Sequence, residues 1–281
     1  MMEPYDSRPC ALGEGPLWHP ERRQLFWFDI LGHRLLSREG DRPLSWQFDE
    51  CVSAAGWIDR ETLLIASETA LWRFDIGTGT RLRLVALEEG NRVTRSNDGR
   101  ADPQGGFWIG TMGKSAEARA GAIYRYHRGA LRRLYADLTI PNAISFAPDG
   151  RSACFADTRQ QRIFRVALDA EGWPCDEPQV LVDLAPEGLF PDGAVFDRDG
   201  GLWNAQWGAG RVARYRPDGT FDRAIAVPAR QSSCPAFGGD GLGTLFVTSA
   251  AVDIAGADTA QGCVYAVAAG VTGMAEHRFR T

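Results

Sequence analysis

The sequence lacks the features that mark nucleic-acid-binding and membrane-spanning proteins. Its 31 basic residues form no run longer than two, as at Arg22-Arg23 and Arg132-Arg133, and 36 acidic residues give a net charge of −5. A surface that follows phosphates needs clustered positive charge, so we expect no nucleic-acid partner. No apolar stretch approaches the roughly 20 residues that cross a bilayer, and we therefore expect no membrane partner.

Signatures of disulfide scaffolds and of nucleophilic enzymes are also missing. The six cysteines show no C-x-x-C spacing, and the first residues do not form a basic and then apolar leader. We therefore expect reduced thiols and a cytoplasmic location. A G-x-S-x-G motif is absent, and the four histidines have no evident acid or cysteine partner in the pattern, which disfavours serine or cysteine catalysis.

What the chain does contain is a six-fold repeat, in which each segment reads as a strand, a tight turn and a second strand. The turns carry residues that accept a positive φ, such as Pro-Asp-Gly at 148–150. The segments begin at Gly15, Gly56, Asp98, Ala143, Gly193 and Ala236. Successive repeats are 41 to 50 residues apart, a spacing typical of propeller blades. Helix signals are nearly absent.

The remaining strands complete this architecture. Alternating polar and apolar residues indicate third strands, and the expected ranges are 70–75, 122–127, 162–168, 211–216 and 263–268. Fourth strands are expected at 44–48, 82–87, 131–136, 180–184 and 223–227. The sixth blade is completed by 274–279, by 7–12, or by both. We predict an all-β, six-bladed propeller with four-stranded antiparallel blades around a central channel, forming one domain over residues 1–281.

Four polar residues fall at one phase of this repeat, just before the first strands: Glu14, Asn97, Asn142 and Asp192. Innermost strands of a propeller line its channel, so equal phase predicts convergence on the axis. Two carboxylates in a desolvated channel need a proton or a cation to compensate their repulsion. Oxygen donors alone suit Ca²⁺, Mg²⁺ or Mn²⁺, with Zn²⁺ and Fe²⁺ as alternatives. Individually, each residue could instead cap a turn.

Arg95 precedes Asn97 by two residues, which places both side chains on one side of an extended segment. Its guanidinium is a candidate for holding a substrate hydroxyl or carboxylate, and the alternative is an ordinary surface arginine. Trp18 and Trp207 either pack between blades or reach the channel mouth and stack on a sugar ring.

Five motifs in order carry a family resemblance: LGEGPLW (12–18), RSNDGRADPQGGFWIGTM (95–112), PNAISFAPDGR (141–151), PDGAVFDRDGGLW (191–203) and CPAFGGDGLGTLFVTSA (234–250). The chain thereby resembles the gluconolactonase, senescence-marker-protein and luciferin-regenerating-enzyme family of six-bladed propellers. That resemblance implies that Glu14, Asn142 and Asp192 bind one divalent metal. It also implies that Arg95 and Asn97 contact a sugar-lactone substrate or the metal-bound water.

The implied reaction opens an aldonolactone, such as a xylono-, arabinono-, galactono- or gluconolactone, to the aldonic acid. We hypothesise that Asp192 is the catalytic residue, which either accepts a proton from the attacking water or orients a hydroxide. One departure affects specificity, because relatives often place an acid shortly after the Thr-Met pair, whereas Met112 is followed here by Gly113, Lys114 and Ser115. The competing hypothesis is a non-catalytic calcium-binding regulator or a protein-interaction propeller.

Overall fold

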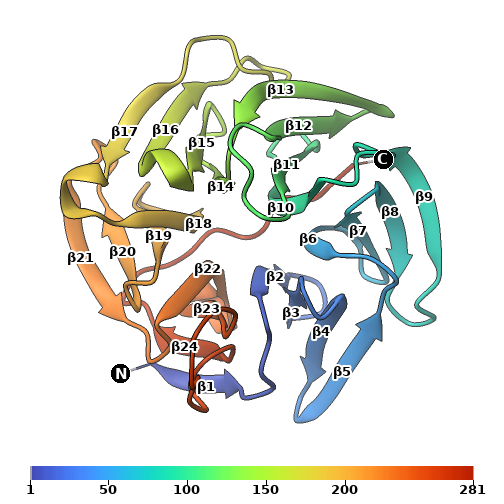
Figure 1. Cartoon of the computed structure of the whole chain (residues 1–281), viewed down its shortest axis with the longest axis horizontal. Coiled ribbons are helices and arrows are strands. Elements are labelled where there is room, and N and C mark those ends of the chain that lie inside the picture. Colours follow the sequence, from blue (N-terminus) through green and yellow to red (C-terminus); the bar gives the residue numbers. More distant parts are fainter. Residues whose placement is uncertain (1, 281) are drawn as a thin grey trace.

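The computed structural model describes residues 2–280 as six four-stranded sheets arranged around a central axis (Figure 1). All strand pairs within the sheets are antiparallel, which confirms the predicted six-bladed β-propeller. The innermost strands are β2 (Gly13–His19), β6 (Val52–Asp59), β10 (Thr94–Ala101), β14 (Pro141–Phe146), β18 (Phe190–Phe196) and β22 (Gln231–Gly238). The second strands are β3 (Gln24–Asp29), β7 (Thr62–Ser67), β11 (Phe107–Gly113), β15 (Ser152–Asp157), β19 (Leu202–Trp207) and β23 (Thr244–Ala250).

Outer strands follow in the expected order. The third strands are β4 (Arg34–Glu39), β8 (Ala70–Asp75), β12 (Gly121–His127), β16 (Arg162–Ala167), β20 (Arg211–Tyr215) and β24 (Val264–Ala268). The fourth strands are β5 (Arg42–Gln47), β9 (Arg81–Ala86), β13 (Ala130–Leu138), β17 (Gln179–Asp183), β21 (Phe221–Ala226) and β1 (Glu3–Asp6). Within the described part of the chain, residues 2–280, helical structure is limited to the short 3₁₀ turns η1 (Thr158–Gln160), η2 (Ala185–Glu187) and η3 (Asp240–Leu242).

Ring closure differs from both expected segments. The sixth sheet has the order β1-β24-β23-β22, so the N-terminal strand Glu3–Asp6 supplies its outer edge. Residues 7–12 instead lead from that strand to the first blade, apart from an isolated bridge between Leu12 and Ala250. Residues 274–279 contribute no blade strand. The sequence did not predict this edge strand because Glu3–Asp6 has only four residues and is largely polar, so it shows no clear alternation of polar and apolar residues.

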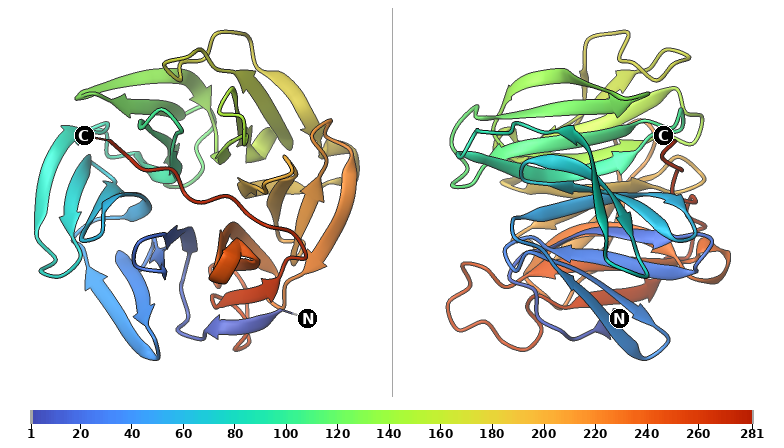
Figure 2. Two further views of the ribbon diagram at one scale, coloured as in Figure 1. Left: turned by 180° about the vertical axis from the view of Figure 1, so that it is seen from behind. Right: turned by 90° about the vertical axis from the view of Figure 1, so that its right-hand side faces the viewer.

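The C-terminal segment crosses the axis on the opposite face from the one in front in Figure 1, as the left view of Figure 2 shows. Its backbone forms isolated bridges from Gly273 to Asp197 and from Arg278 to Trp57, which link the fifth and second blades. Glu276 lies in this segment and pairs with Arg100 on β10, with both side chains nearly buried. The segment therefore closes one end of the channel.

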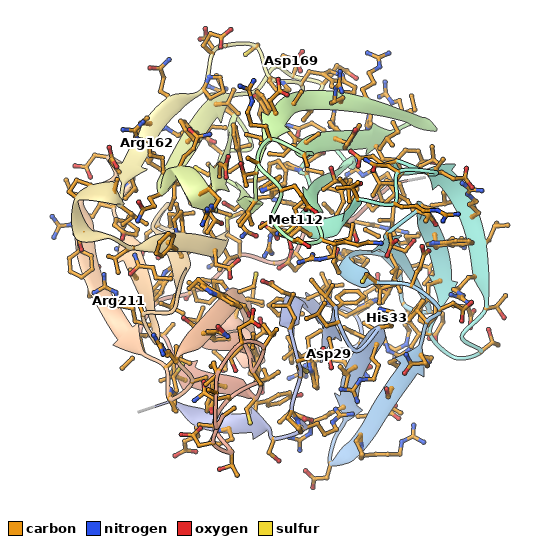
Figure 3. The ribbon with its side chains drawn as sticks, viewed as in Figure 1. Asp29, His33, Met112, Arg162, Asp169 and Arg211 are labelled. Atoms are coloured by element: carbon orange, nitrogen blue, oxygen red, sulfur yellow. The ribbon has the colours of Figure 1, made fainter. Side chains whose placement is uncertain are left out.

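Six separate apolar clusters fill the six seams between neighbouring blades. Apolar side chains from both neighbouring blades pack against each other in each seam. Trp203 of the fifth blade, for example, contacts Phe237 of the sixth, with ring centroids 6.0 Å apart. The apolar side chains of each blade therefore pack against the neighbouring blades. Polar side chains of the innermost strands face the axis instead. Figure 3 shows Met112 near this axis, with Arg162 and Asp169 at the periphery.

Candidate functional site

Each innermost strand carries a pairing irregularity near the residue that faces the axis. The register shifts lie between Glu14 and Leu17, Ser96 and Gly99, Asn142 and Ser145, Pro191 and Ala194, Ser232 and Pro235, and Val52 and Ala54. A bulge changes the direction of a side chain relative to regular alternation. The sequence repeat therefore corresponds to a bulge repeated in every innermost strand. These bulges turn the four polar side chains toward one cavity.

Two glycines explain how the acidic side chains reach that position. Gly15 has a φ of +52°, and a Cβ there would collide with the carbonyl oxygen of Ser53. A Cβ on Gly193 would collide with the side chain of Cys234 from the neighbouring blade. Glu14 and Asp192 are therefore each followed by a position where any residue other than glycine would displace the adjoining blade.

A cavity of about 300 Å³ opens at this end of the channel. Its lining includes all five residues that the sequence singles out: Glu14, Arg95, Asn97, Asn142 and Asp192. Each is nearly buried, with an exposed fraction between 4% and 6%. The structure thus gathers side chains from four blades, spread over 178 positions of the chain, around one space.

The two carboxyl groups lie within hydrogen-bonding reach of each other. Burial raises the pKa of Glu14, and the charge of Asp98 adds to that rise. Burial likewise raises the pKa of Asp192, with the charges of Glu14 and Asp98 acting in the same direction. A cation placed between these groups would remove both penalties, because it offsets the repulsion and replaces the lost hydration.

A chain of hydrogen bonds fixes the amides beside the carboxyl groups. Arg95 Nη1 donates to Asn97 Oδ1 over 2.8 Å, and Asn97 Nδ2 donates to Asn142 Oδ1 over 3.0 Å. Asn142 Nδ2 in turn donates to Thr158 Oγ1 over 2.9 Å, and the Thr158 hydroxyl donates to the carbonyl oxygen of Pro191 over 2.7 Å. Each amide is thereby held in one orientation, with one lone pair of Asn142 Oδ1 still available.

This donor set fits a divalent cation. Glu14 and Asp192 contribute carboxylate oxygens and Asn142 contributes an amide oxygen, which are the ligand types that hard cations prefer. Three or more His, Cys, Asp or Glu side chains do not come together as a metal-binding group anywhere in residues 2–280. The site therefore depends on amide oxygen as well as on acid, which argues against a structural zinc centre.

The segment after Met112, where the sequence lacks the acid that relatives often have, contributes Lys114 to the cavity rim. Lys114 lines the cavity and forms an ion pair with Glu68, a residue of the second blade. An acid is thus present at this rim, although it comes from another blade and is paired with lysine. Trp207 also lines the cavity, as one alternative anticipated. Trp18 does not, since it stacks on Phe246 in the seam between the first and sixth blades.

Thr158 lines the cavity, and the charge of Asp98 acts on Glu14 and Asp192, but neither residue was singled out from the sequence. Thr158 begins η1 after the second strand of its blade, so it does not share the phase of the first-strand residues. Asp98 directly follows Asn97 and was interpreted only as the first residue of the third repeat segment. Its Oδ2 accepts a hydrogen bond from the backbone of Ile144 over 2.7 Å, which ties the third blade to the fourth.

A sequence profile described as the SMP-30/Gluconolactonase/LRE-like region matches residues 12–251. The chain belongs to this family. The recognised resemblance is thereby confirmed, and the matched range contains all five predicted site residues of this SMP-30/gluconolactonase-like chain.

Several members of this family are similar over nearly the whole chain. An L-arabinolactonase of Azospirillum brasilense is 37% identical, covering 96% of this chain and 92% of the relative. A Rhizobium meliloti protein provisionally named a sugar lactone lactonase is 43% identical over 88% of this chain and 86% of its own length. A crystal structure of regucalcin from Agrobacterium tumefaciens, named as a calcium-binding protein, has a TM-score of 0.97 at 37% identity and covers 100% of this chain and 98% of that one.

Two further properties concern the chain as a whole. Among residues 2–280, no helix has the length and apolar character needed to span a bilayer. All six cysteines are free, and Cys175 is the exposed one. The cytoplasmic location and the single-domain organisation stay predictions.

Proposed function

We propose that this protein hydrolyses a sugar (aldono-) lactone to the aldonic acid in a reaction that requires one divalent cation. The lactonase relatives and the family identify the chain as a sugar lactonase, an enzyme rather than a non-catalytic propeller. The observation that carries the finer proposal is the adjacency of two buried carboxyl groups, Glu14 and Asp192, beside an oriented amide oxygen in an open cavity. Two carboxyl groups in such a place need a cationic partner if both are to be ionised.

We assign metal binding to Glu14, Asn142 and Asp192. A divalent cation bound there would polarise the carbonyl of the lactone. Ca²⁺ is the first candidate because the donors are all oxygen and because the similar regucalcin is named as a calcium-binding protein. Mg²⁺, Mn²⁺, Zn²⁺ and Fe²⁺ are the other cations to test.

Asp192 is the catalytic residue in this proposal. Its carboxylate takes a proton from the attacking water, whose oxygen bonds to the lactone carbonyl carbon. The ring carbon–oxygen bond then breaks, and the proton passes to the departing ring oxygen, which becomes a hydroxyl group. Positioned proton transfer of this kind typically contributes 10²- to 10⁴-fold to the rate.

Arg95 and Asn97 contact the substrate. Within residues 2–280, the hydrogen bonds of the Arg95 side chain all come from Nη1, so Nε and Nη2 are available as donors to a sugar hydroxyl or to the lactone oxygen. Asn97 holds the arginine in place and keeps one lone pair of Oδ1 for a substrate hydroxyl. The cavity volume suits a single sugar ring, and the candidates are xylono-, arabinono-, galactono- and gluconolactones.

The test is acid release from freshly prepared aldonolactones, followed with a pH indicator. Chelator-treated protein is reconstituted separately with each of the five cations, and spontaneous hydrolysis is subtracted. We expect metal-dependent acid release from at least one pentono- or hexonolactone. Equal rates with and without added cation would contradict the metal requirement, and no acid release from any lactone would contradict the proposed activity.

A further inference from the structure

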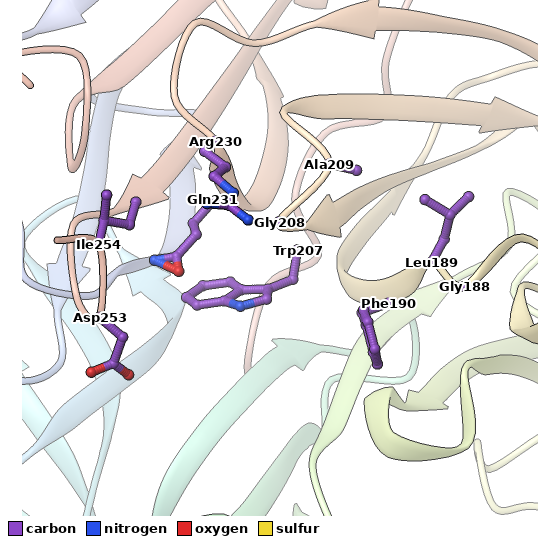
Figure 4. A pocket seen from close by; sticks show the side chains of 10 residues that line it. All are labelled: Gly188, Leu189, Phe190, Trp207, Gly208, Ala209, Arg230, Gln231, Asp253 and Ile254. Atoms are coloured by element: carbon purple, nitrogen blue, oxygen red, sulfur yellow. The ribbon is translucent and has the colours of Figure 1, made fainter. Parts of the chain in front are cut away.

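A second cavity, of about 490 Å³, lies beside the site cavity and shares two of its lining residues, Trp207 and Asp253. Figure 4 shows its walls, with the Trp207 ring between Gln231 on one side and Phe190 on the other. Since the same indole lines both cavities, a ligand that extends past Trp207 passes from one into the other. Small-molecule sites typically measure 300 to 1,000 Å³, so the site cavity alone is at the lower limit of that range.

The second cavity combines aromatic surface with unpaired polar groups. Phe190 is 37% exposed, which makes it one of the few large apolar side chains that the fold leaves open. The guanidinium of Arg230 and the carboxylate of Asp253 have no ion-pair partner within the described residues 2–280. Gln231 Nε2 donates to the backbone oxygen of Val252 over 2.6 Å, which orients the amide and leaves its oxygen open to a ligand.

These groups match a second sugar ring. A pyranose presents an apolar face of C–H groups, which suits the indole and the phenyl ring, and a rim of hydroxyls, which both donate and accept hydrogen bonds. Arg230 and Asp253 carry opposite charges, so the cavity has no excess of one sign to select an anionic group. A purely apolar substituent would leave three polar side chains desolvated without partners.

We propose that this cavity is a subsite for the glycosyl group of a glycosylated aldonolactone, so that the substrate class includes aldobionolactones. This inference rests on the proposed function, because it places the lactone ring in the site cavity and the neutral sugar attached to it across Trp207. The subsite adds binding energy away from the reacting carbonyl, and its effect is therefore expected mainly in KM.

The test compares glucono-1,5-lactone with its 4-linked and 6-linked glucosyl derivatives on the metal-loaded full chain. We expect at least one glucosyl derivative to show a KM about tenfold lower than gluconolactone, at similar kcat. A tenfold or larger loss of kcat/KM for both derivatives would overturn the inference while leaving the proposed function intact. A stronger preference for a lactone with a 6-phosphate group would also overturn it, since that outcome indicates an anion subsite.

Variants of the second cavity separate a subsite from a general effect. Phe190→Ala and Arg230→Ala are each expected to raise the KM of the preferred glucosyl lactone about tenfold relative to that of gluconolactone. Phe221→Ala is the matched control, because Phe221 is also exposed, at 53%, but lies on the outer strand β21. Equal changes of KM for both substrates in the two cavity variants would contradict the proposal.

A binding measurement keeps the inference testable if no lactone is hydrolysed. Calorimetry with the corresponding acids, gluconate and its 4-linked and 6-linked glucosyl derivatives, reports on the subsite without turnover. We expect at least one glucosylated acid to bind about tenfold more tightly than gluconate, and this gain to be absent in Phe190→Ala. Equal affinity for all three acids would overturn the subsite, whatever the activity.

Discussion

The side-chain amide of Asn142 donates to the hydroxyl of Thr158 over 2.9 Å, and that hydroxyl is itself committed to the backbone oxygen of Pro191. Because the hydroxyl proton is used by Pro191, Thr158 can only accept from Asn142. The nitrogen of the Asn142 amide is thereby kept away from the carboxyl groups, and its oxygen faces the position that we assign to the cation. Thr158 is thus a positioning residue for a proposed metal ligand.

Replacing Thr158 tests this orientation. Thr158→Val keeps the shape but removes the acceptor, so we expect cation affinity to fall 10- to 100-fold, the usual effect of losing a group that orients a ligand. Activity at saturating cation should recover most of its value. Thr158→Ser retains the hydroxyl and should bind the cation as the unmodified protein does. Competition with a fluorescent chelator measures the affinity, and an unchanged Kd in the valine variant would contradict the assignment.

Asp192→Asn tests the proton-transfer step. The amide cannot take a proton from water, so we expect kcat for the lactone to fall by about 10²- to 10⁴-fold. The backbone around Asp192 is held by Asn204, whose Nδ2 donates to the Asp192 carbonyl oxygen over 2.8 Å, and should persist in the variant. Initial rates are compared at saturating cation, with circular dichroism as the check on folding. Full activity with cation bound would eliminate Asp192 as catalytic residue.

Glu14→Gln should separate stability from cation binding. The substitution removes one of two adjacent buried acids, so the chelator-treated variant should melt at a higher temperature than the unmodified protein at pH 8. The same variant loses a carboxylate ligand, and added cation should then raise its melting temperature far less. Thermal scans with chelator and with each cation measure both effects. A variant that is less stable in chelator yet equally stabilised by cation would contradict the proposed site.

Asp98 gives a pH dependence of stability. Burial raises its pKa from the usual 3.8 to about 6, so the folded chain holds a proton there that the unfolded chain has already lost. The contribution of Asp98 to the free energy of unfolding is therefore largest below pH 4. It declines as the pH rises through 6, by at most on the order of 3 kcal/mol. Asp98→Asn cannot titrate and should show a correspondingly smaller decline. Urea unfolding of chelator-treated protein at pH 4 and pH 7 measures the difference.

The buried pair Arg100–Glu276 tests the role of the C-terminal segment. Glu276→Ala leaves a buried guanidinium without its partner, and we expect the free energy of unfolding to fall by about 3 to 5 kcal/mol. Glu171→Ala is the control, because Glu171 pairs with Arg128 on the surface, where side-chain exposure is 58% and 75%. Removal of that exposed pair should cost less than about 1 kcal/mol. Equal losses in the two variants would show that the C-terminal contact contributes no more than a surface pair.

Most of the fold could be predicted from the sequence because strand and turn chemistry recurs locally. Third strands such as 70–75 have the bounds expected, since alternation and turn residues are both present there. Fourth strands were located to within a few residues, because an outer strand has one exposed face and weaker constraints. The polar residues of the innermost strands were found by phase alone, which depends on the repeat and not on any contact.

What the sequence did not reveal depends on partners that are distant along the chain. Glu3–Asp6 becomes a strand because β24 offers an unpaired edge, and the residues around Glu3–Asp6 give no sign of that partner. Thr158 matters only through Asn142 and Pro191, which belong to two neighbouring blades. Glu276 and Arg100 are 176 positions apart, and their pairing requires a C-terminal segment that crosses the axis. Trp18 was ambiguous because only the seam geometry distinguishes packing from exposure.

Closure of the sixth sheet by the first strand has a consequence for the order of events during synthesis. Strand β24 must emerge before β1 can pair, so the circle of blades stays open until nearly the whole polypeptide has been made. Glu14 and Asp192 occupy the first and fifth blades, and their separation is held only when that circle is complete. Unfinished chains therefore lack the arrangement of acids to which we assign the cation, so we expect cation binding only after the ring of blades has closed.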